Sequence, residues 1–303
     1  AQGSGAENVI DMGKGSVHVQ NVSDDGVSAA DGGKNTVSGG EVVVDAGDTG
    51  LFAKDGGSNT VAAQDGDVSI DADGWGMVAQ NNATNSVAAT GGSGNITAGK
   101  QGLQAQGGSV NSVTTTDGDI TINADWDGVA ASDNSTNNLS ATNGSVSIKT
   151  DTWGISSTVN SSANVDVVNG NLEIDAIGRG IHAYDDSINT VSVTNGDVNI
   201  NAGWEGLMAH FGGTNNIDVA GGSVFINGDW EGVYSYNESA NNLTIADGSL
   251  HINSKTTGAR AEQNSVNTVA VTDGDISIQA TSNGARVDGL AAVSNGSNVL
   301  SAT

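Results

Sequence analysis

The sequence contains no cysteine and no proline, and only 11 of its 303 residues are aromatic. Without cysteine the chain forms no disulfide, although this alone identifies no compartment. Because this composition, with 45 Gly as well, is far from that of an average globular domain, a conventional globular core is not expected. Basic residues are also scarce, with nine Lys and Arg against 35 Asp and Glu. The formal charge of −26 would repel a phosphate backbone, so no nucleic-acid partner is expected.

Long apolar runs are missing as well. The sequence contains no stretch of about 18 apolar residues, which is the length that a membrane span needs. We also find no charged segment followed by an apolar one at its start, as a secretory leader would have. We therefore expect a soluble chain, either mature or truncated, that does not itself insert into a membrane.

The chain is rich in glycine, with 45 residues, and in a repeat of 26 residues. Each unit begins with an asparagine or its substitute, followed by a small polar residue and an aliphatic one. These first residues, taken as position 1, are Asn59, Asn85, Asn111, Asn137, Ala163, Asn189, Asn215, Asn241 and Asn267. An earlier copy starts at Asn35, a diverged one lies near Asn8, and the last copy ends around Asn298. The chain therefore holds about eleven units.

Each unit carries the pattern of three short strands. Apolar or small residues alternate with others at positions 3 and 5, at 10, 12 and 14, and at 19 and 21, which is the period of a strand. Position 12 is isoleucine in all nine regular units, from Ile70 to Ile278. Positions 8 and 18 are always glycine, which marks corners that need a positive φ or tight packing.

One unit of three short strands cannot bury its inner face, but stacked units enclose a continuous core. The sequence therefore predicts an all-β chain folded as a parallel β-solenoid. The position-1 asparagines would stack as a hydrogen-bonded ladder, interrupted at Ala163. We expect one domain over residues 1–303, with 1–34 as diverged first coil(s), 35–292 as regular repeats and 293–303 as the start of a further coil or a truncated end. High charge with low hydrophobicity also typifies disorder, but the strict register argues against it.

The aromatic residues of the regular units avoid the inferred core positions. In three successive coils, the outward positions 20 and 22 of the third strand carry large aromatic, imidazole or thioether side chains. Corner tryptophans flank them, and arginines occupy position 20 in the next two coils. The predicted ligand-binding strip is His182, Tyr184, Trp204, Met208, His210, Trp230, Tyr234, Tyr236, Arg260 and Arg286.

Such planar faces with polar neighbours suit a sugar or a loop of a partner protein. Alternatively, the strip packs on a neighbouring chain or simply tolerates large side chains. Two further tryptophans, Trp75 and Trp153, have inward parity and could plug the corner instead.

Acidic residues recur in the first turn of three units, at Asp65, Asp67, Asp117, Asp119, Asp273 and Asp275. Asp-Gly pairs are ordinary turn formers, so a solvated turn is the favoured interpretation. Carboxylates repeated along a rod also repel one another and invite a hard cation such as Ca²⁺. The 26-residue period is not the nine-residue pattern of calcium-binding rolls, so calcium is the secondary hypothesis. No other cofactor is expected.

Catalysis is not expected. Parallel β-helices that cleave acidic polysaccharides present clustered carboxylates with basic residues, and Arg179 with Glu205 and Glu231 could be arranged in that way. However, no Ser/His/Asp order, zinc motif or phosphate loop is present, and identical repeat lengths leave no inserted loop to hold a site. A polysaccharide-degrading enzyme is kept only as a remote alternative.

Units such as "NTVSVTNGDVNINAGWEGLMAH" (residues 189–210) are rich in Gly, Asn, Ser, Thr and Val and cover most of the chain. In this the sequence resembles the passenger regions of bacterial type V secreted proteins, the autotransporters and filamentous-haemagglutinin-like adhesins. The resemblance implies secretion or display on a bacterial cell surface. It also implies adhesion to a host or bacterial surface glycan or protein, or aggregation with other copies.

A self-assembling extracellular filament is the main alternative function. A solenoid presents an unpaired strand edge at each end, and end-to-end contacts between copies generate an open filament.

Overall fold

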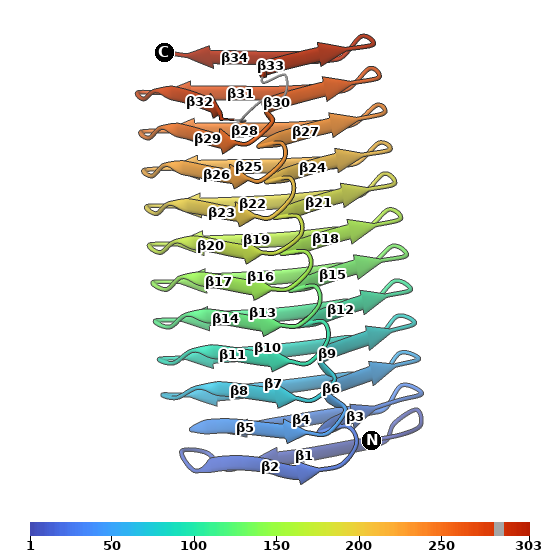
Figure 1. Cartoon of the computed structure of the whole chain (residues 1–303). Coiled ribbons are helices and arrows are strands. Elements are labelled where there is room, and N and C mark those ends of the chain that lie inside the picture. Colours follow the sequence, from blue (N-terminus) through green and yellow to red (C-terminus); the bar gives the residue numbers. More distant parts are fainter. Residues whose placement is uncertain (282–287) are drawn as a thin grey trace.

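The structure of the chain, a computed structural model, describes residues 1–281 and 288–303. These residues form 34 strands and no helix. The strands make three parallel sheets, and each turn of the chain adds one strand to each sheet (Figure 1). The predicted all-β parallel solenoid, with three strands per coil of about 26 residues and about 11 coils, is confirmed.

The first sheet has 12 strands, β1 (Glu7–Asp11), β4 (Lys34–Gly39), β7 (Ser58–Gln64), β10 (Thr84–Thr90), β13 (Val110–Thr116), β16 (Thr136–Thr142), β19 (Ser162–Val168), β22 (Ile188–Thr194), β25 (Thr214–Ala220), β28 (Ala240–Ala246), β31 (Val266–Thr272) and β34 (Ser297–Ala302).

The second sheet has 11 strands, β2 (Ser16–Val22), β5 (Glu41–Ala46), β8 (Val68–Ala72), β11 (Gly94–Ala98), β14 (Ile120–Ala124), β17 (Val146–Thr150), β20 (Leu172–Ala176), β23 (Val198–Ala202), β26 (Val224–Gly228), β29 (Leu250–Ser254) and β32 (Ile276–Ala280).

The third sheet also has 11 strands, β3 (Val27–Ala29), β6 (Thr49–Lys54), β9 (Trp75–Gln80), β12 (Leu103–Gln106), β15 (Val129–Ser132), β18 (Ile155–Thr158), β21 (Ile181–Tyr184), β24 (Leu207–His210), β27 (Val233–Tyr236), β30 (Thr257–Glu262) and β33 (Asp288–Val293).

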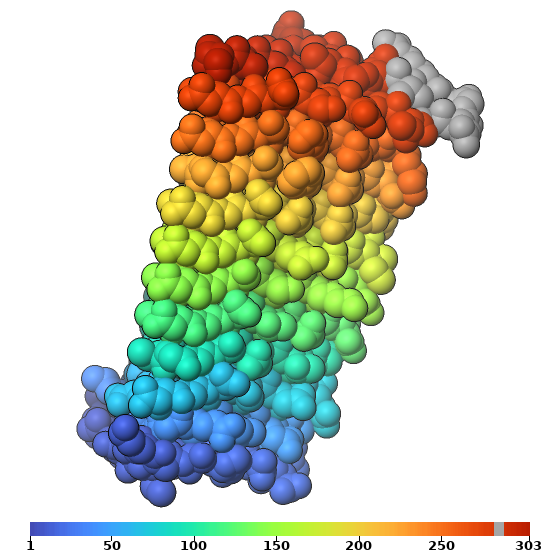
Figure 2. Space-filling view, turned by 90° about the vertical axis from the view of Figure 1, so that its left-hand side faces the viewer, coloured from blue at the N-terminus to red at the C-terminus, as the bar shows by residue number. Residues whose placement is uncertain are grey.

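Residues at the same repeat position lie side by side in neighbouring coils, for example Val87 beside Val113. The register shifts between Val19 and Val22, inside the segment predicted to be diverged. The coils are visible as parallel layers of a continuous rod (Figure 2). No helix with the length and apolar content needed to cross a membrane occurs among the described residues.

The core consists of columns of aliphatic side chains from the inner faces of all three sheets. Within the described residues, positions 3, 5, 10, 12, 14, 19 and 21 of the regular units are buried, as the alternation predicts, except that Ile276, Ile278 and Ala280 are only partly buried. Because the coils supply mostly Val, Ile, Leu and Ala side chains at these positions, with a few Ser, Thr and Met, the described coils interlock without any aromatic residue in the interior.

The predicted asparagine ladder is present and lies inside the solenoid. Each amide nitrogen donates to the next asparagine at 2.8 to 3.1 Å, from Asn35 to Asn137 and again from Asn189 to Asn298. The same nitrogen also donates to the main-chain carbonyl seven residues earlier, as Asn189 does to His182 at 2.8 Å. At the gap left by Ala163, the Ser157 hydroxyl donates to Asn189 Oδ1 at 2.6 Å.

Glycine is required at the two corners by close packing rather than by a positive φ. A Cβ on Gly76 would lie 2.4 Å from Ile96 Cγ2, and one on Gly196 would lie 1.8 Å from the carbonyl oxygen of Gly170. At the first of these corners, position 8 of the unit, the left-handed conformation belongs instead to the residue before the glycine, such as Asp65 with φ of 63° and Asp117 with φ of 58°. Asp and Asn adopt this conformation more readily than most residues.

Replacing one ladder residue tests the contribution of the column. Asn111→Ala removes the acceptor of Asn85 and leaves the Gln104 carbonyl and Asn137 Oδ1 without their buried donor. We expect the free energy of unfolding, measured with urea, to fall by about 1–3 kcal/mol because buried polar atoms lose partners. The matched control Asn123→Ala changes an exposed asparagine of the same coil and should cost less than about 0.5 kcal/mol. Equal losses in both variants would contradict a structural ladder.

Candidate functional site

The third sheet brings six residues of the predicted strip into two adjacent columns. His182, Met208 and Tyr234 are register neighbours in β21, β24 and β27, and so are Tyr184, His210 and Tyr236. The imidazole of His210 lies 5.5 Å from the Tyr184 ring and 4.9 Å from the Tyr236 ring, measured between centroids. The predicted clustering of these side chains is therefore confirmed.

The prediction that all six side chains lie on the surface is wrong for His182 and Met208, each of which is only 5% exposed. The indole of Trp153 lies over the outer face of β21 and meets the His182 ring edge-on at 5.2 Å. Trp153, one of the two tryptophans that could plug the corner by their inward parity, is partly buried and packs on this outward side chain instead of in the core. Both ring nitrogens of His182 lack a hydrogen-bond partner among the described residues.

Arg179, which the predicted strip did not include, connects the buried and exposed parts of this face. Its guanidinium carbon lies 5.5 Å from the centroid of Trp153 and 5.4 Å from that of Trp204. Its Nε also forms an ion pair with the buried Glu205 carboxylate at 2.8 Å. The arginine is thus held by charge and by two indole faces, which fixes the position of Trp204 at the edge of the sheet.

A second cluster of charged side chains lies at the C-terminal end of the strip. Arg260 pairs with Glu262 and, at 3.4 Å, with Glu231, and its guanidinium lies 5.5 Å from the Tyr234 ring centroid. Burial raises the pKa of Glu231, and the nearby Glu205 carboxylate adds to this, against the opposing effect of Arg260. The Tyr234 hydroxyl donates to Glu262 at 3.3 Å. Arg286, also predicted for this site, lies outside the described residues.

The exposed part of the strip is a set of planar rings. The indoles of Trp204 and Trp230 stack at 5.8 Å with an interplanar angle of 13°, and they are 42% and 53% exposed. Phe211, also missing from the predicted strip, packs on His210 at 4.2 Å and remains largely exposed. We call the surface formed by Tyr184, Trp204, His210, Phe211, Trp230 and Tyr236 the aromatic platform.

Phe211 occupies an unusual place in the turn. Its φ is 50°, a left-handed value that other turns of this column give mostly to Asn, Asp or Gly. A bulky side chain is strained in that conformation, and such strain is often found at functional positions. A phenylalanine in a slot that Asn, Asp or Gly fills in most other coils was the signal in the sequence that could have identified this residue.

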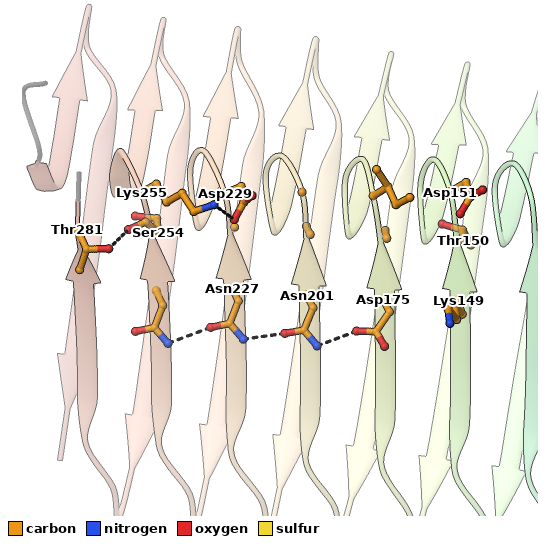
Figure 3. A pocket seen from close by; sticks show the side chains of 16 residues that line it. Lys149, Thr150, Asp151, Asp175, Asn201, Asn227, Asp229, Ser254, Lys255 and Thr281 are labelled. Carbon is orange, nitrogen blue, oxygen red and sulfur yellow. Dashed lines mark hydrogen bonds and ion pairs between the residues drawn. The ribbon is translucent and has the colours of Figure 1, made fainter. Parts of the chain in front are cut away.

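On the other side of the corner, a groove of about 550 Å³ follows the edge of the second sheet (Figure 3). Its floor carries a ladder in which Asn201 donates to Asp175 at 2.7 Å, Asn227 to Asn201 at 2.8 Å, and Asn253 to Asn227 at 2.9 Å. We call it the amide groove. Five consecutive acids or amides at position 13, from Asp175 to Gln279, marked this groove in the sequence but were not part of the predicted site.

The aspartates considered for calcium act as turn residues. The carboxylates of Asp67 and Asp119 each accept a main-chain N–H of the next coil at 2.7 Å, and Asp65 faces Lys14 at 3.7 Å. In residues 1–281 and 288–303, the group of three acidic side chains close enough to share an ion is a different one, Asp24, Asp25 and Asp48. Calcium binding at the predicted aspartates stays a prediction.

Comparison of the chain with protein-family models, curated proteins and solved structures finds no match. The resemblance to adhesin passenger regions and the function that it implies therefore stay expectations.

The buried His182 predicts an acid-dependent loss of stability. Burial lowers the pKa of His182 to about 3, with smaller contributions from Arg179 and His210, whereas the ordinary value is 6.5. Because the unfolded chain binds this proton first, the contribution of the neutral imidazole is complete above pH 6.5. It is lost as the pH falls toward 3, at about 1.4 kcal/mol per pH unit.

The variant His182→Met, which copies the residue of the next coil, should remove this dependence. Between pH 7 and 5 the wild type should lose about 2 kcal/mol more than the variant in urea unfolding. Parallel pH dependences in the two proteins would show that His182 titrates normally in the folded chain.

Proposed function

We propose that the chain is an extracellular adhesive module, displayed on or released from a bacterium, which binds a neutral glycan through the aromatic platform. The observation that carries this proposal is the parallel, exposed Trp204–Trp230 stack at the start of β24 and β27. The rings of Tyr184, His210 and Tyr236 form a second group at the other end of β21, β24 and β27. Indole faces stack on the apolar faces of sugar rings, while nearby polar groups bind hydroxyls.

The distribution of aromatic residues supports a specialised region of the rod. Nine of the 11 aromatic residues lie between Trp126 and Tyr236, in a chain whose core needs none of them. Exposed aromatic clusters of this kind commonly mark binding surfaces.

Charge supports a neutral ligand over an acidic one. The net charge is −26, and the arginines at the platform are already paired, Arg179 with Glu205 and Arg260 with Glu262. Among the described residues of this face, both arginines are engaged in ion pairs, so an anionic glycan would meet the negative field without a free arginine of the described part to receive it. Arg179 and Arg260 are held both by these ion pairs and by contacts with the Trp204 and Tyr234 rings. Charged groups that hold aromatic rings in place favour binding over catalysis.

Deleting two platform rings tests this function. Trp230→Ala combined with Tyr236→Ala should weaken binding to a neutral glycan, identified on a glycan array with the intact rod, by about tenfold or more. Far-ultraviolet circular dichroism should be unchanged, because both side chains point away from the core. The control Phe225→Ala removes a ring from the second sheet and should bind as the wild type does.

Unchanged binding in the double variant would reject the platform. Binding only to a protein partner would reject a glycan ligand. End-to-end stacking into a filament needs the terminal coils rather than these rings. If a variant that no longer binds the glycan still assembles into filaments, the result would favour the filament as the function.

The strain at Phe211 predicts opposite effects on stability and binding. Phe211→Asn places a residue that tolerates φ of 50° in this turn, so the free energy of unfolding should rise by about 1 kcal/mol. Loss of the ring beside His210 should weaken glycan binding. Val159→Asn is the matched control, since Val159 has φ of 56° at the same repeat position but lies outside the platform.

The control should gain similar stability and keep full binding. A Phe211→Asn protein that binds as well as the wild type would show that the strained ring serves no ligand.

A further inference from the structure

A separate pocket opens on the corner of the rod, between the indoles of Trp126 and Trp204. Its volume is about 350 Å³, at the small end of the range for ligand pockets and suited to a single ring rather than to a large molecule. Trp126, which is 49% exposed, belongs to neither the predicted strip nor the platform. The pocket therefore adds surface that the proposed function does not yet use.

The pocket exists because two coils lack a large side chain in the corner slot. Trp126 and Trp204 occupy position 16 three coils apart, about 14 Å along the rod, with Thr152 and Gly178 between them. Gly178 cannot be larger, since a Cβ would lie 2.6 Å from the Thr152 carbonyl oxygen and 2.9 Å from Trp153 Cδ1. Main-chain packing thus keeps the space between the two indoles open.

The floor of the pocket is held in place before any ligand arrives. Trp153 lines it, and the indole is fixed by the edge-on contact with His182 at 5.2 Å and by the Arg179 guanidinium at 5.5 Å. A rigid aromatic surface loses little conformational entropy on binding a ring. Three indoles around one small pocket provide faces for stacking.

Carboxylates form the polar part of the lining. Asp127 Oδ1 accepts the Thr152 hydroxyl and, at 3.4 Å, the Trp153 main-chain N–H. Asp151 stands exposed at the mouth of the pocket. Ionised carboxylates accept hydrogen bonds from hydroxyls and repel acidic groups, so the lining selects a neutral, hydroxyl-bearing ring.

The pocket adjoins the amide groove, because Asp151 and Ile177 line both. Along the groove floor, Asn201 and Asn227 each use one N–H and one carbonyl contact within the ladder. An amide has two N–H donors and an oxygen with two lone pairs, so each can still donate and accept outward. The groove therefore offers the same donor and acceptor pair once per coil, along the rod axis (Figure 3).

We infer that the corner pocket binds one pyranose residue of a neutral linear glycan, and that the following residues of the same glycan lie in the amide groove. The inference rests on the proposed function, because it takes the ligand to be a neutral glycan. The inference goes beyond the proposed function in the surface that binds the glycan. Trp126 belongs to the corner pocket and Asn227 to the amide groove, and neither belongs to the platform.

Titration with cellohexaose, maltohexaose and mannohexaose, with hexagalacturonic acid as the acidic counterpart, tests this site by calorimetry and tryptophan fluorescence. Thr152→Trp fills the pocket with a side chain that the same slot holds in three other coils, and Trp126→Ala removes one wall. For the neutral hexasaccharide that the wild type binds, each change should weaken binding about tenfold or more. Phe225→Ala is the control and should bind as the wild type does.

Asn227→Ala should weaken binding of the hexasaccharide but not of the matching disaccharide, which is too short to leave the pocket. Equal affinity of both pocket variants and the wild type for a bound hexasaccharide would overturn the pocket while leaving the platform intact. An Asn227→Ala variant with wild-type affinity for the hexasaccharide would overturn the groove. Failure of the wild type to bind any neutral hexasaccharide, or stronger binding of the acidic one, would overturn the neutral-glycan function itself.

Discussion

The buried asparagine column is the interaction on which the rest of the structure depends. Except at the gap left by Ala163, the amides along the column donate both to the next asparagine and to a carbonyl of the third sheet, as Asn215 does to Asn241 at 2.9 Å and to Met208 at 2.8 Å. The column therefore satisfies polar main-chain groups where the chain turns from the third sheet to the first. Because the bonded carbonyls belong to the strands of the platform, the interior also positions the surface rings.

Because the register is strict, residues at the same repeat position stack in columns along the rod. These columns of side chains explain both the fold and its sites. Small residues stack at the glycine corners, and aliphatic residues stack inside, at the spacing of parallel strands. A change at one position in a few coils then creates a local surface without disturbing the core. Trp204 and Trp230 in adjacent coils become a stacked pair, whereas Gly178 one coil earlier leaves a pocket.

The fold and the clustering of the strip could be predicted because both depend on periodicity. Alternation indicates which side chains point inward, and a fixed period indicates which residues are neighbours. What covers an outward side chain depends on the path of the corner, which periodicity does not describe. His182 was therefore expected on the surface, although Trp153 covers it. Arg179 and Phe211 were left out of the strip, although they contact rings of a neighbouring coil, Trp204 and Tyr184 respectively.

The sequence by itself determined the solenoid, its coil length, its core columns and the asparagine ladder with its gap at Ala163, because each follows from residue type repeated at a constant interval. Only the tertiary structure decided which aromatic rings are exposed, which arginines are paired, and where the pocket and the amide groove open. These features depend on the directions of side chains at a corner and on contacts between coils. Burial and charge pairing arise only when the coils are assembled into the rod.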